Sequence, residues 1–166
     1  METFKIIEGF ETYSVSDHGN VKNNKTGRIL KYKHRNGYTL ADLSVCGIVS
    51  TKTIHQLVAR AFIENPEGKR CVDHIDNDRS NNKLHNIRWA THVENNRNRK
   101  ICSINTSGAK GVSFVKHTQK WTSHITIDGI HIHLGTFSNL EDAKQARMIK
   151  ANQAFGIYTN ACEKII

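Results

Sequence analysis

The segment from Val72 to Arg99, VDHIDNDRSNNKLHNIRWATHVENNRNR, constrains the fold of this chain more than any other segment. An Asp-His pair ends a short apolar run, and the polar loop DNDRSNN follows it. A second short run leads to Thr91, which stands three residues before Glu94 and has the Ser/Thr-x-x-Glu spacing of a helix capping box. The sequence therefore predicts a strand, a loop, a second strand and a helix in that order.

This order can bring four polar side chains around one point, namely Asp73, His74, Asn86 and Asn95. A carboxylate and an amide carbonyl are hard oxygen ligands, which suit Mg²⁺ or Mn²⁺. His74, with an unperturbed pKa of about 6.5, is a candidate general base, although alternation along a strand points it away from Asp73 unless the strand bends. An isolated Asp-His pair is usually a satisfied polar pair, and Asn-rich loops are usually turns. The joint occurrence of all four residues favours a functional site.

The same residues resemble the HNH nuclease motif, the ββα-metal finger of colicin-type toxins and of phage and intron homing endonucleases. Asn86 follows His74 by 12 residues and Asn95 follows it by 21, the spacing of the phage-intron branch. The resemblance implies that His74 is the general base, that Asn86 orients it, and that Asp73 and Asn95 bind one divalent metal ion. Other branches place His at the position of Asn95 and again four residues later, where this chain has Arg99. This departure favours an oxygen-bound Mg²⁺, with Mn²⁺ as the alternative.

The composition favours a nucleic-acid partner. The chain has 166 residues, 24 Lys and Arg against 15 Asp and Glu, and a formal net charge of +9. A basic excess of this kind indicates a polyanion partner, but it does not separate DNA from RNA. The four cysteines form no C-x-x-C pair, which gives little support to a zinc finger and makes free thiols in a reducing compartment the default.

Neither an 18-residue apolar run nor a signal-peptide core is present in the sequence. We therefore expect no membrane partner, no secretion and an intracellular location. By the resemblance, this would be a phage- or virus-infected or intron-bearing cell.

The first 50 residues are predicted to be short strands and turns, with Ile29-Leu30 and Tyr38 to Leu43 among the strands. The run FKIIEGFETYSVSDHGNVKN resembles the small modular domain that often precedes HNH motifs in homing endonucleases. We assign residues 51–103 to the nuclease core. An amphipathic helix at its start is indicated by Ile54, Leu57, Val58, Ala61 and Phe62. His55, beside that apolar stripe, is interpreted as a packing or capping residue.

Residues 104–166 follow a different pattern. Apolar and polar residues alternate before and after Asp128-Gly129, a strong hairpin turn, and an earlier short strand precedes them. This predicts a three-stranded antiparallel sheet with one apolar and one polar face. Ser138 and Glu141 form a second capping box, so a helix should start there and stop at Gly156.

Residues 107–158 resemble the APETALA2/ethylene-response-factor DNA-binding domain, through KGV at 110–112, LGTF at 134–137 and the Ala-rich helix ending in Phe155-Gly156. Such a domain lays its sheet in the major groove. Carried over by position, the groove-facing residues are Lys110, Ser113, Lys120, His124, Thr126, His131 and His133. Arg97 and Arg99, in the basic extension after Asn95, are added as DNA contacts. The plant members have several Arg and Trp in the sheet where this chain does not, so plant-like GC-rich specificity is not expected.

The predicted fold class is therefore α+β: a ββα-metal HNH nuclease core with a small N-terminal sheet, followed by a C-terminal three-stranded antiparallel sheet packed on one helix. The predicted function is a site-specific, metal-dependent endonuclease of the HNH homing type, acting on double-stranded DNA as a monomer without an obligate protein partner. One active site per chain indicates that one strand is nicked. The alternatives are a DNA-binding regulator with an inactive nuclease scaffold, against which the four retained positions argue, and an RNA-binding module.

Overall fold

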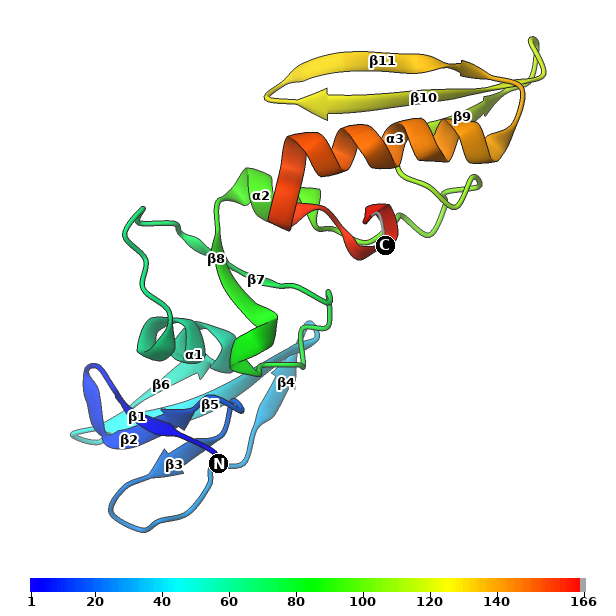
Figure 1. The fold of residues 1–166 in the computed structure, drawn as a ribbon. Coiled ribbons are helices and arrows are strands. Elements are labelled where there is room, and N and C mark those ends of the chain that lie inside the picture. Colours follow the sequence, from blue (N-terminus) through cyan, green and yellow to red (C-terminus); the bar gives the residue numbers. More distant parts are fainter. Residues whose placement is uncertain (165–166) are drawn as a thin grey trace. The chain divides into compact units, whose positions relative to one another are not determined.

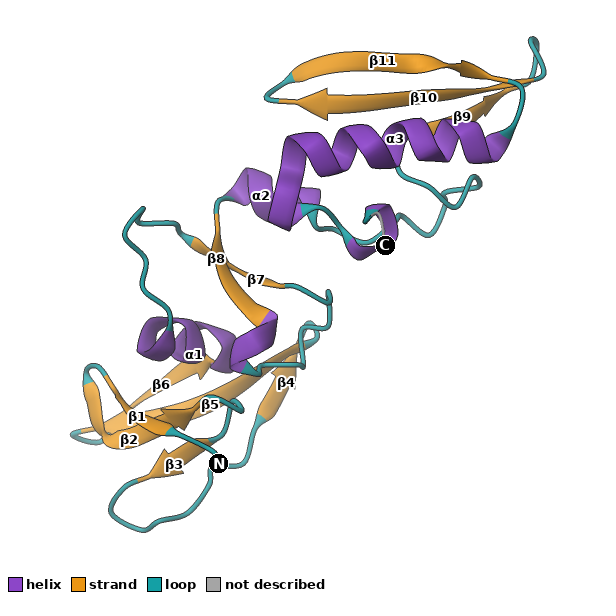
Figure 2. Ribbon diagram, viewed as in Figure 1, coloured by secondary structure: helices purple, strands orange, loops and turns teal. Residues whose placement is uncertain are grey.

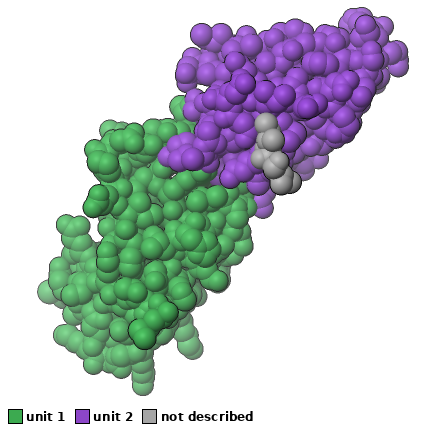
Figure 3. Space-filling model, in the orientation of Figure 1, with its two compact units in different colours: residues 1–95 green, residues 96–166 purple. Residues whose placement is uncertain are grey.

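The computed structural model describes residues 1–164 and divides the chain into two compact units, residues 1–95 and residues 96–166 (Figure 3). The division falls inside the short helix α2 (His92–Arg97). Both units combine antiparallel sheets with helices, so the predicted α+β class is confirmed (Figure 2). All four cysteines are free, as expected. Within residues 1–164, no helix is both long and apolar enough to span a membrane.

The first unit opens with two three-stranded antiparallel sheets (Figure 1). Their strands are β1 (Phe4–Ile7), β2 (Phe10–Ser16) and β3 (Val21–Asn23), then β4 (Lys33–Arg35), β5 (Tyr38–Val45) and β6 (Ile48–Thr53). The predicted strand at Ile29-Leu30 is wrong. Ile29 forms only an isolated bridge with Lys22 of β3. The two backbone hydrogen bonds on either side of it, from the Asn23 amide to the Arg28 carbonyl and from the Leu30 amide to the Val21 carbonyl, are too few to make a strand.

Helix α1 (Ile54–Phe62) confirms the predicted amphipathic helix and packs against the first two sheets. One apolar core joins them, made of Ile7, Tyr13, Val15, Val21, Ala41, Leu43, Ile54, Leu57 and Val58. Burial of each large apolar side chain contributes about 1.5–3 kcal/mol. The predicted N-terminal segment and the start of the nuclease core therefore share one hydrophobic core.

The predicted order of strand, loop, strand and helix is present after α1. Its elements are β7 (Cys71–His74), the 3-10 turn η1 (Leu84–Asn86), β8 (Ile87–Ala90) and α2. The capping box is reciprocal: Glu94 Oε2 accepts from the Thr91 amide at 2.7 Å, and Thr91 Oγ1 accepts from the Glu94 amide at 3.2 Å. The indole Nε1 of Trp89 donates to the carbonyl of Ile63 at 3.0 Å, which attaches β8 to the end of α1.

The second unit is a three-stranded sheet with a helix along one face (Figure 1). Its elements are β9 (Val112–Val115), β10 (Lys120–Ile127), β11 (Ile130–Phe137), α3 (Leu140–Phe155), η2 (Gly156–Tyr158) and η3 (Ala161–Glu163). The helix is capped by Asn139 rather than by the predicted Ser138. The side chain of Asn139 accepts from the Glu141 amide at 2.7 Å, and asparagine is as good a cap as serine. Gly156 ends α3, as predicted.

Small residues allow close packing in this unit. Ala143 and Ala151 of α3 are fully buried, and Ala151 joins Ile125 and Phe155 in the core. Gly111 lies against β10 with φ of 63°, and a Cβ there would stand only 2.2 Å from the carbonyl oxygen of His124. The glycine of the KGV motif is therefore required by backbone contact between the loop and the sheet.

Candidate active site

Asp73 ends up in a buried ion pair. It faces Arg88 directly across the β7–β8 ladder, and its side chain is almost fully shielded. Nε and Nη2 of Arg88 both donate to Oδ2 of Asp73, at 2.8 and 2.6 Å. The predicted metal ligand therefore already has a cationic partner that the sequence analysis did not identify.

His74 lies among different neighbours from Asp73, as alternation along a strand requires. Its ring is 4.9 Å from the ring of His55 on α1 and 6.2 Å from that of Tyr38 on β5, measured between centroids. Its Nε2 lies 3.3 Å from Oδ1 of Asn82. The predicted base is thus packed between α1 and β5, and His55 is the packing residue that the sequence suggested.

Burial controls the charge of these two histidines. His74 is only 5% exposed and His55 only 6%. Burial lowers the pKa of His74, against the opposing effects of the Asn82 hydrogen bond and of nearby aspartates, Asp76 first among them. Burial, together with the charge of His74, lowers the pKa of His55 to about 4. Both imidazoles are therefore neutral near pH 7, and a neutral imidazole can accept a proton.

Asn86 is buried, but its side chain serves the loop that follows His74. Its Oδ1 accepts from the Asp76 amide at 3.0 Å, while Nδ2 donates to Asp76 Oδ1 at 2.9 Å and to the Asn81 carbonyl at 2.8 Å. Burial alone would raise the pKa of Asp76, but hydrogen bonds from Asp78, Asn81 and Asn86 lower it. These contacts keep an anionic carboxylate near His74.

Asn95 is half-buried in the second turn of α2, and its amide nitrogen donates to the Thr91 carbonyl at 3.0 Å. Over residues 1–164, no three His, Cys, Asp or Glu side chains cluster as a metal site. The two predicted ligands, Asp73 and Asn95, carry carboxylate and amide oxygens, which are hard donors. Mg²⁺ is commonly held by one or two carboxylates together with substrate phosphates, so the donor chemistry of these residues suits such an ion.

Three residues contact the predicted site without having been predicted there from the sequence: Asn82, Arg88 and, as a neighbour of the base, His55. Asn82 stands in an Asn-rich loop whose composition indicated only turns. Arg88 alternates with apolar neighbours, and its position opposite Asp73 follows only from the strand register. An antiparallel alignment of the two predicted strands that places residue 73 opposite residue 88 could have suggested this ion pair.

The polar face of the second unit is largely as predicted. The β9–β10 and β10–β11 registers place Ser113, Lys120, His124, Thr126, His131 and His133 on the side of the sheet that does not pack on α3. The His124 and His131 rings lie 4.8 Å apart, and Thr126 Oγ1 lies 3.4 Å from His131 Nδ1. Burial, then the charges of His131 and Arg147, lower the pKa of His124.

Two predicted DNA contacts are instead held inside the second unit. Arg97 pairs with Asp128 at 3.0 Å and stacks on the Phe155 ring at 4.6 Å. Lys110 donates to the Arg97 carbonyl at 3.0 Å and lies 3.6 Å from Glu163, and burial lowers its pKa. Arg99, by contrast, is exposed. Their partners come from the β10–β11 turn (Asp128), the end of α3 (Phe155) and η3 (Glu163), and the sequence did not indicate that these parts meet Arg97 and Lys110.

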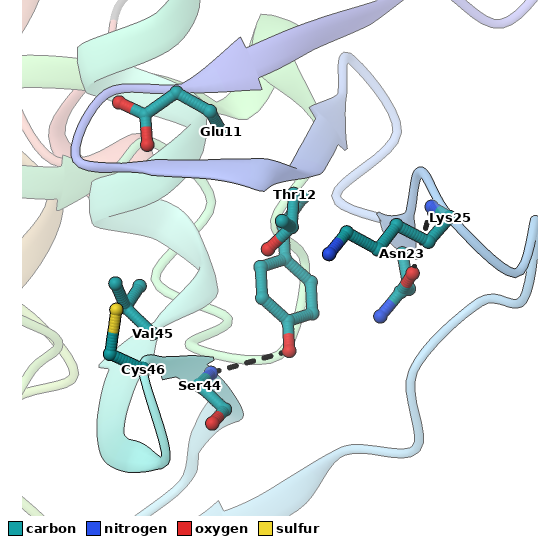
Figure 4. A pocket seen from close by; sticks show the side chains of 8 residues that line it. Glu11, Thr12, Asn23, Lys25, Ser44, Val45 and Cys46 are labelled. Atoms are coloured by element: carbon teal, nitrogen blue, oxygen red, sulfur yellow. Dashed lines mark hydrogen bonds between the residues drawn. The ribbon is translucent and has the colours of Figure 1, made fainter.

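A separate hollow on the first unit is lined by Glu11, Thr12, Tyr13, Asn23, Lys25, Ser44, Val45 and Cys46 (Figure 4). The Tyr13 hydroxyl accepts from the Ser44 amide at 3.3 Å inside it. The hollow shares no residue with the histidine cluster or with the Asp73 pair. It is therefore not part of the candidate active site.

The ββα arrangement and its polar cluster define an HNH endonuclease, and comparison with known proteins agrees. Residues 52–97 match the HNH endonuclease family, whose members typically use a divalent metal ion. Residues 2–44 match the NUMOD4 motif, which confirms the expected modular segment before the nuclease core. DNA endonuclease I-HmuI of Bacillus phage SP01 is 37% identical over 132 residues, covering 76% of this chain and 74% of that protein. The chain belongs to the HNH homing endonucleases of the I-HmuI type.

A solved structure and two viral proteins extend the comparison. The structure described as "DNA binding and cleavage by the HNH homing endonuclease I-HmuI" superposes with a TM-score of 0.53 and 34% identity, covering 79% of this chain and 76% of that one. The uncharacterized HNH endonucleases L247 and L245 of Acanthamoeba polyphaga mimivirus are 46% identical over 92 residues and 37% over 109. These alignments cover 54% and 66% of this chain, but it spans only 23% and 32% of the length of those two proteins.

Proposed function

We propose that this protein is a metal-dependent endonuclease that hydrolyses one phosphodiester bond in double-stranded DNA and so nicks one strand. The single observation that carries the proposal is the buried, neutral His74 in the ββα frame, beside Asp73. Similarity to I-HmuI, whose solved structure is described as concerning DNA binding and cleavage, supports DNA as the substrate.

His74 acts as the general base. The neutral imidazole takes a proton from water, the water oxygen attacks phosphorus, the bond to the 3′ oxygen breaks, and that oxygen takes a proton from solvent. The products are a 5′-phosphate and a 3′-hydroxyl. Because Asp76, Asp73 and Asp78 each act to raise the pKa of His74, their charges stabilise the imidazolium that forms. The contact of Asn82 with Nε2, and the packing of the ring on His55, limit the orientations of the base.

Asp73 and Asn95 are the proposed ligands of one divalent ion, with Mg²⁺ favoured over Mn²⁺ by the oxygen donors. When bound, such an ion stabilises charge on the phosphate and on the leaving oxygen. The proposed role of Asn86 is to fix the loop from Asp76 to Asn81, which follows His74, through its hydrogen bonds to both ends of that loop.

The second unit is proposed to contact DNA through its polar face. Lys120 and Arg99 provide charge for phosphates, and the hydroxyls and imidazoles of Ser113, Thr126, His124, His131 and His133 can donate to or accept from base edges. Arg97 and Lys110 are reassigned to packing within the unit, because each has partners there. The chain carries one candidate site, which supports a monomer that nicks. Its relatives from a phage and a mimivirus support action inside an infected cell.

Supercoiled plasmid provides the decisive test. The full chain with Mg²⁺ should convert supercoiled DNA to the open circle, and EDTA should prevent this. His74→Ala should slow nicking by about 10²–10⁴-fold while DNA affinity stays within about twofold. DNA binding without any metal-dependent nicking would instead identify a regulator with an inactive nuclease scaffold. Equal loss of binding and nicking in His74→Ala would make His74 a structural residue.

A further inference from the structure

The carboxylate proposed to hold the metal ion is paired here with a cation of the protein itself. Nε and Nη2 of Arg88 both donate to Oδ2 of Asp73, at 2.8 and 2.6 Å. The pair is largely shielded from water, and the β7–β8 register fixes it, since Asp73 and Arg88 stand directly opposite each other. The guanidinium therefore takes the position next to Oδ2 that a cationic ligand would need.

A guanidinium and a divalent ion cannot both hold one carboxylate oxygen at contact distance. Two cations so close repel strongly where water is sparse. An ion on Oδ2 therefore requires Arg88 to leave that oxygen, and an ion on Oδ1 would still be repelled by the neighbouring guanidinium. A departing, shielded guanidinium needs another anion, because an unpaired buried charge is strongly unfavourable. The planar fork of arginine matches the oxygens of a phosphate, and DNA presents phosphates to the nuclease unit.

We propose that Arg88 is a placeholder for the divalent ion at Asp73, and that it transfers to a backbone phosphate when the nuclease unit binds DNA. The inference rests on the proposed function, because it takes Asp73 as the metal ligand and DNA as the substrate. Arg88 is in this sense a positioning residue that acts through Asp73. It weakens metal binding in the free protein and makes metal loading depend on DNA, which restricts cleavage to the bound state.

The first measurement is the affinity of the full chain for Mn²⁺ in the absence of DNA. Electron paramagnetic resonance detects the free ion during the titration. Arg88→Gln should tighten Mn²⁺ binding by about 10-fold or more, because the competing charge is gone. Arg60→Gln is the matched control: it removes the same charge from an exposed position on α1 and should change the affinity by less than about twofold. Asp73→Asn should abolish binding at this site in either background.

Arg88→Lys supplies a second variant that keeps the charge but loses the two-nitrogen contact. It should tighten Mn²⁺ binding by roughly threefold, between wild type and Arg88→Gln. Circular dichroism melting confirms that each variant is folded. If Arg88→Gln does not fold, the comparison of Arg88→Lys with wild type carries the test.

The second measurement repeats the titration with a phosphorothioate duplex that resists hydrolysis. In wild type, DNA should tighten Mn²⁺ binding by about 10-fold or more, since coupling between two ligands is reciprocal. In Arg88→Gln the same ratio should fall at least about threefold, because the free protein is already competent to bind the ion.

The outcomes separate the two levels of the argument. Tighter Mn²⁺ binding in Arg88→Gln, lost on adding Asp73→Asn, supports the placeholder role. Unchanged or weaker binding in Arg88→Gln and Arg88→Lys, with Asp73→Asn still abolishing it, overturns that role and leaves the proposed metal ligand intact. Mn²⁺ binding that is indifferent to Asp73→Asn overturns the metal ligand itself, and the role of Arg88 with it.

Discussion

The Asn86 side chain could either orient His74 or support the loop that follows His74, and the variant Asn86→Ala distinguishes these two roles. Asn86 is 4% exposed, and its side chain makes three hydrogen bonds, two with Asp76 and one with the Asn81 carbonyl. Each such bond contributes about 0.5–1.5 kcal/mol, and unpaired buried partners add to the loss. The free energy of unfolding should therefore fall by about 2–4 kcal/mol in Asn86→Ala.

Asn82→Ala is the matched comparison, because Asn82 contacts His74 directly. Its Oδ1 lies 3.3 Å from His74 Nε2, a long contact, and its Nδ2 donates to the Ser80 carbonyl at 2.9 Å. Stability should fall by only about 0.5–2 kcal/mol. The nicking rate should nevertheless fall about 10-fold, because the base loses a constraint on its orientation.

Urea unfolding followed by circular dichroism and single-turnover plasmid nicking would be measured on each variant. Asn96→Ala, at an exposed position of α2, is the control and should stay within about 0.5 kcal/mol of wild type. If Asn86→Ala kept its stability but lost nicking by about 10²-fold, Asn86 would act on the base itself. The assignment of Asn86 to the loop would then be wrong.

Four further outcomes are expected. Burial disfavours the charged forms of His74 and His55, so protons bind preferentially to the unfolded chain; stability should be full above pH 6.5 and fall as the pH drops from about 6.5 to 4. His55→Phe should reduce that loss, and an unchanged pH dependence of the unfolding free energy would contradict it. Nicking should keep its rate as the pH is lowered from 8 to about 6.5, because the base stays neutral over this range. A rate that falls by half before the pH has dropped to 7 would refute this. Asp73→Ala should abolish Mg²⁺-dependent nicking and, because it leaves Arg88 unpaired, lower the free energy of unfolding by about 3–5 kcal/mol. Zn²⁺ should support wild-type nicking poorly, and robust nicking in EDTA would refute a metal role. The double change Lys120→Gln and His133→Gln should weaken DNA binding and reduce the salt slope of log K by about 1, whereas Lys150→Gln on α3 should not; gel-shift titrations at several salt concentrations would decide.

Most elements of both units could be predicted from the sequence, and its spacing selected the candidate site residues. The capping box at Thr91, the amphipathic spacing of α1 and the alternation on either side of Asp128-Gly129 all depend on neighbours a few residues apart. Such patterns reflect local backbone geometry, which a single chain segment specifies. Asp73, His74, Asn86 and Asn95 all lie within one segment of 23 residues, so their spacing could also be read from the sequence.

The partners of these residues depend on how distant parts of the chain pack together. Arg88 reaches Asp73 through the strand register, and His55 reaches His74 through the packing of α1. Within the second unit, Arg97 contacts Asp128 and Phe155, and Lys110 contacts Glu163. These contacts join residues distant in sequence, and they form because a buried charge or ring must find a complementary neighbour. A spacing pattern carries no information about such neighbours, so the charge state of the base and the pairing of the metal ligand became visible only in the folded chain.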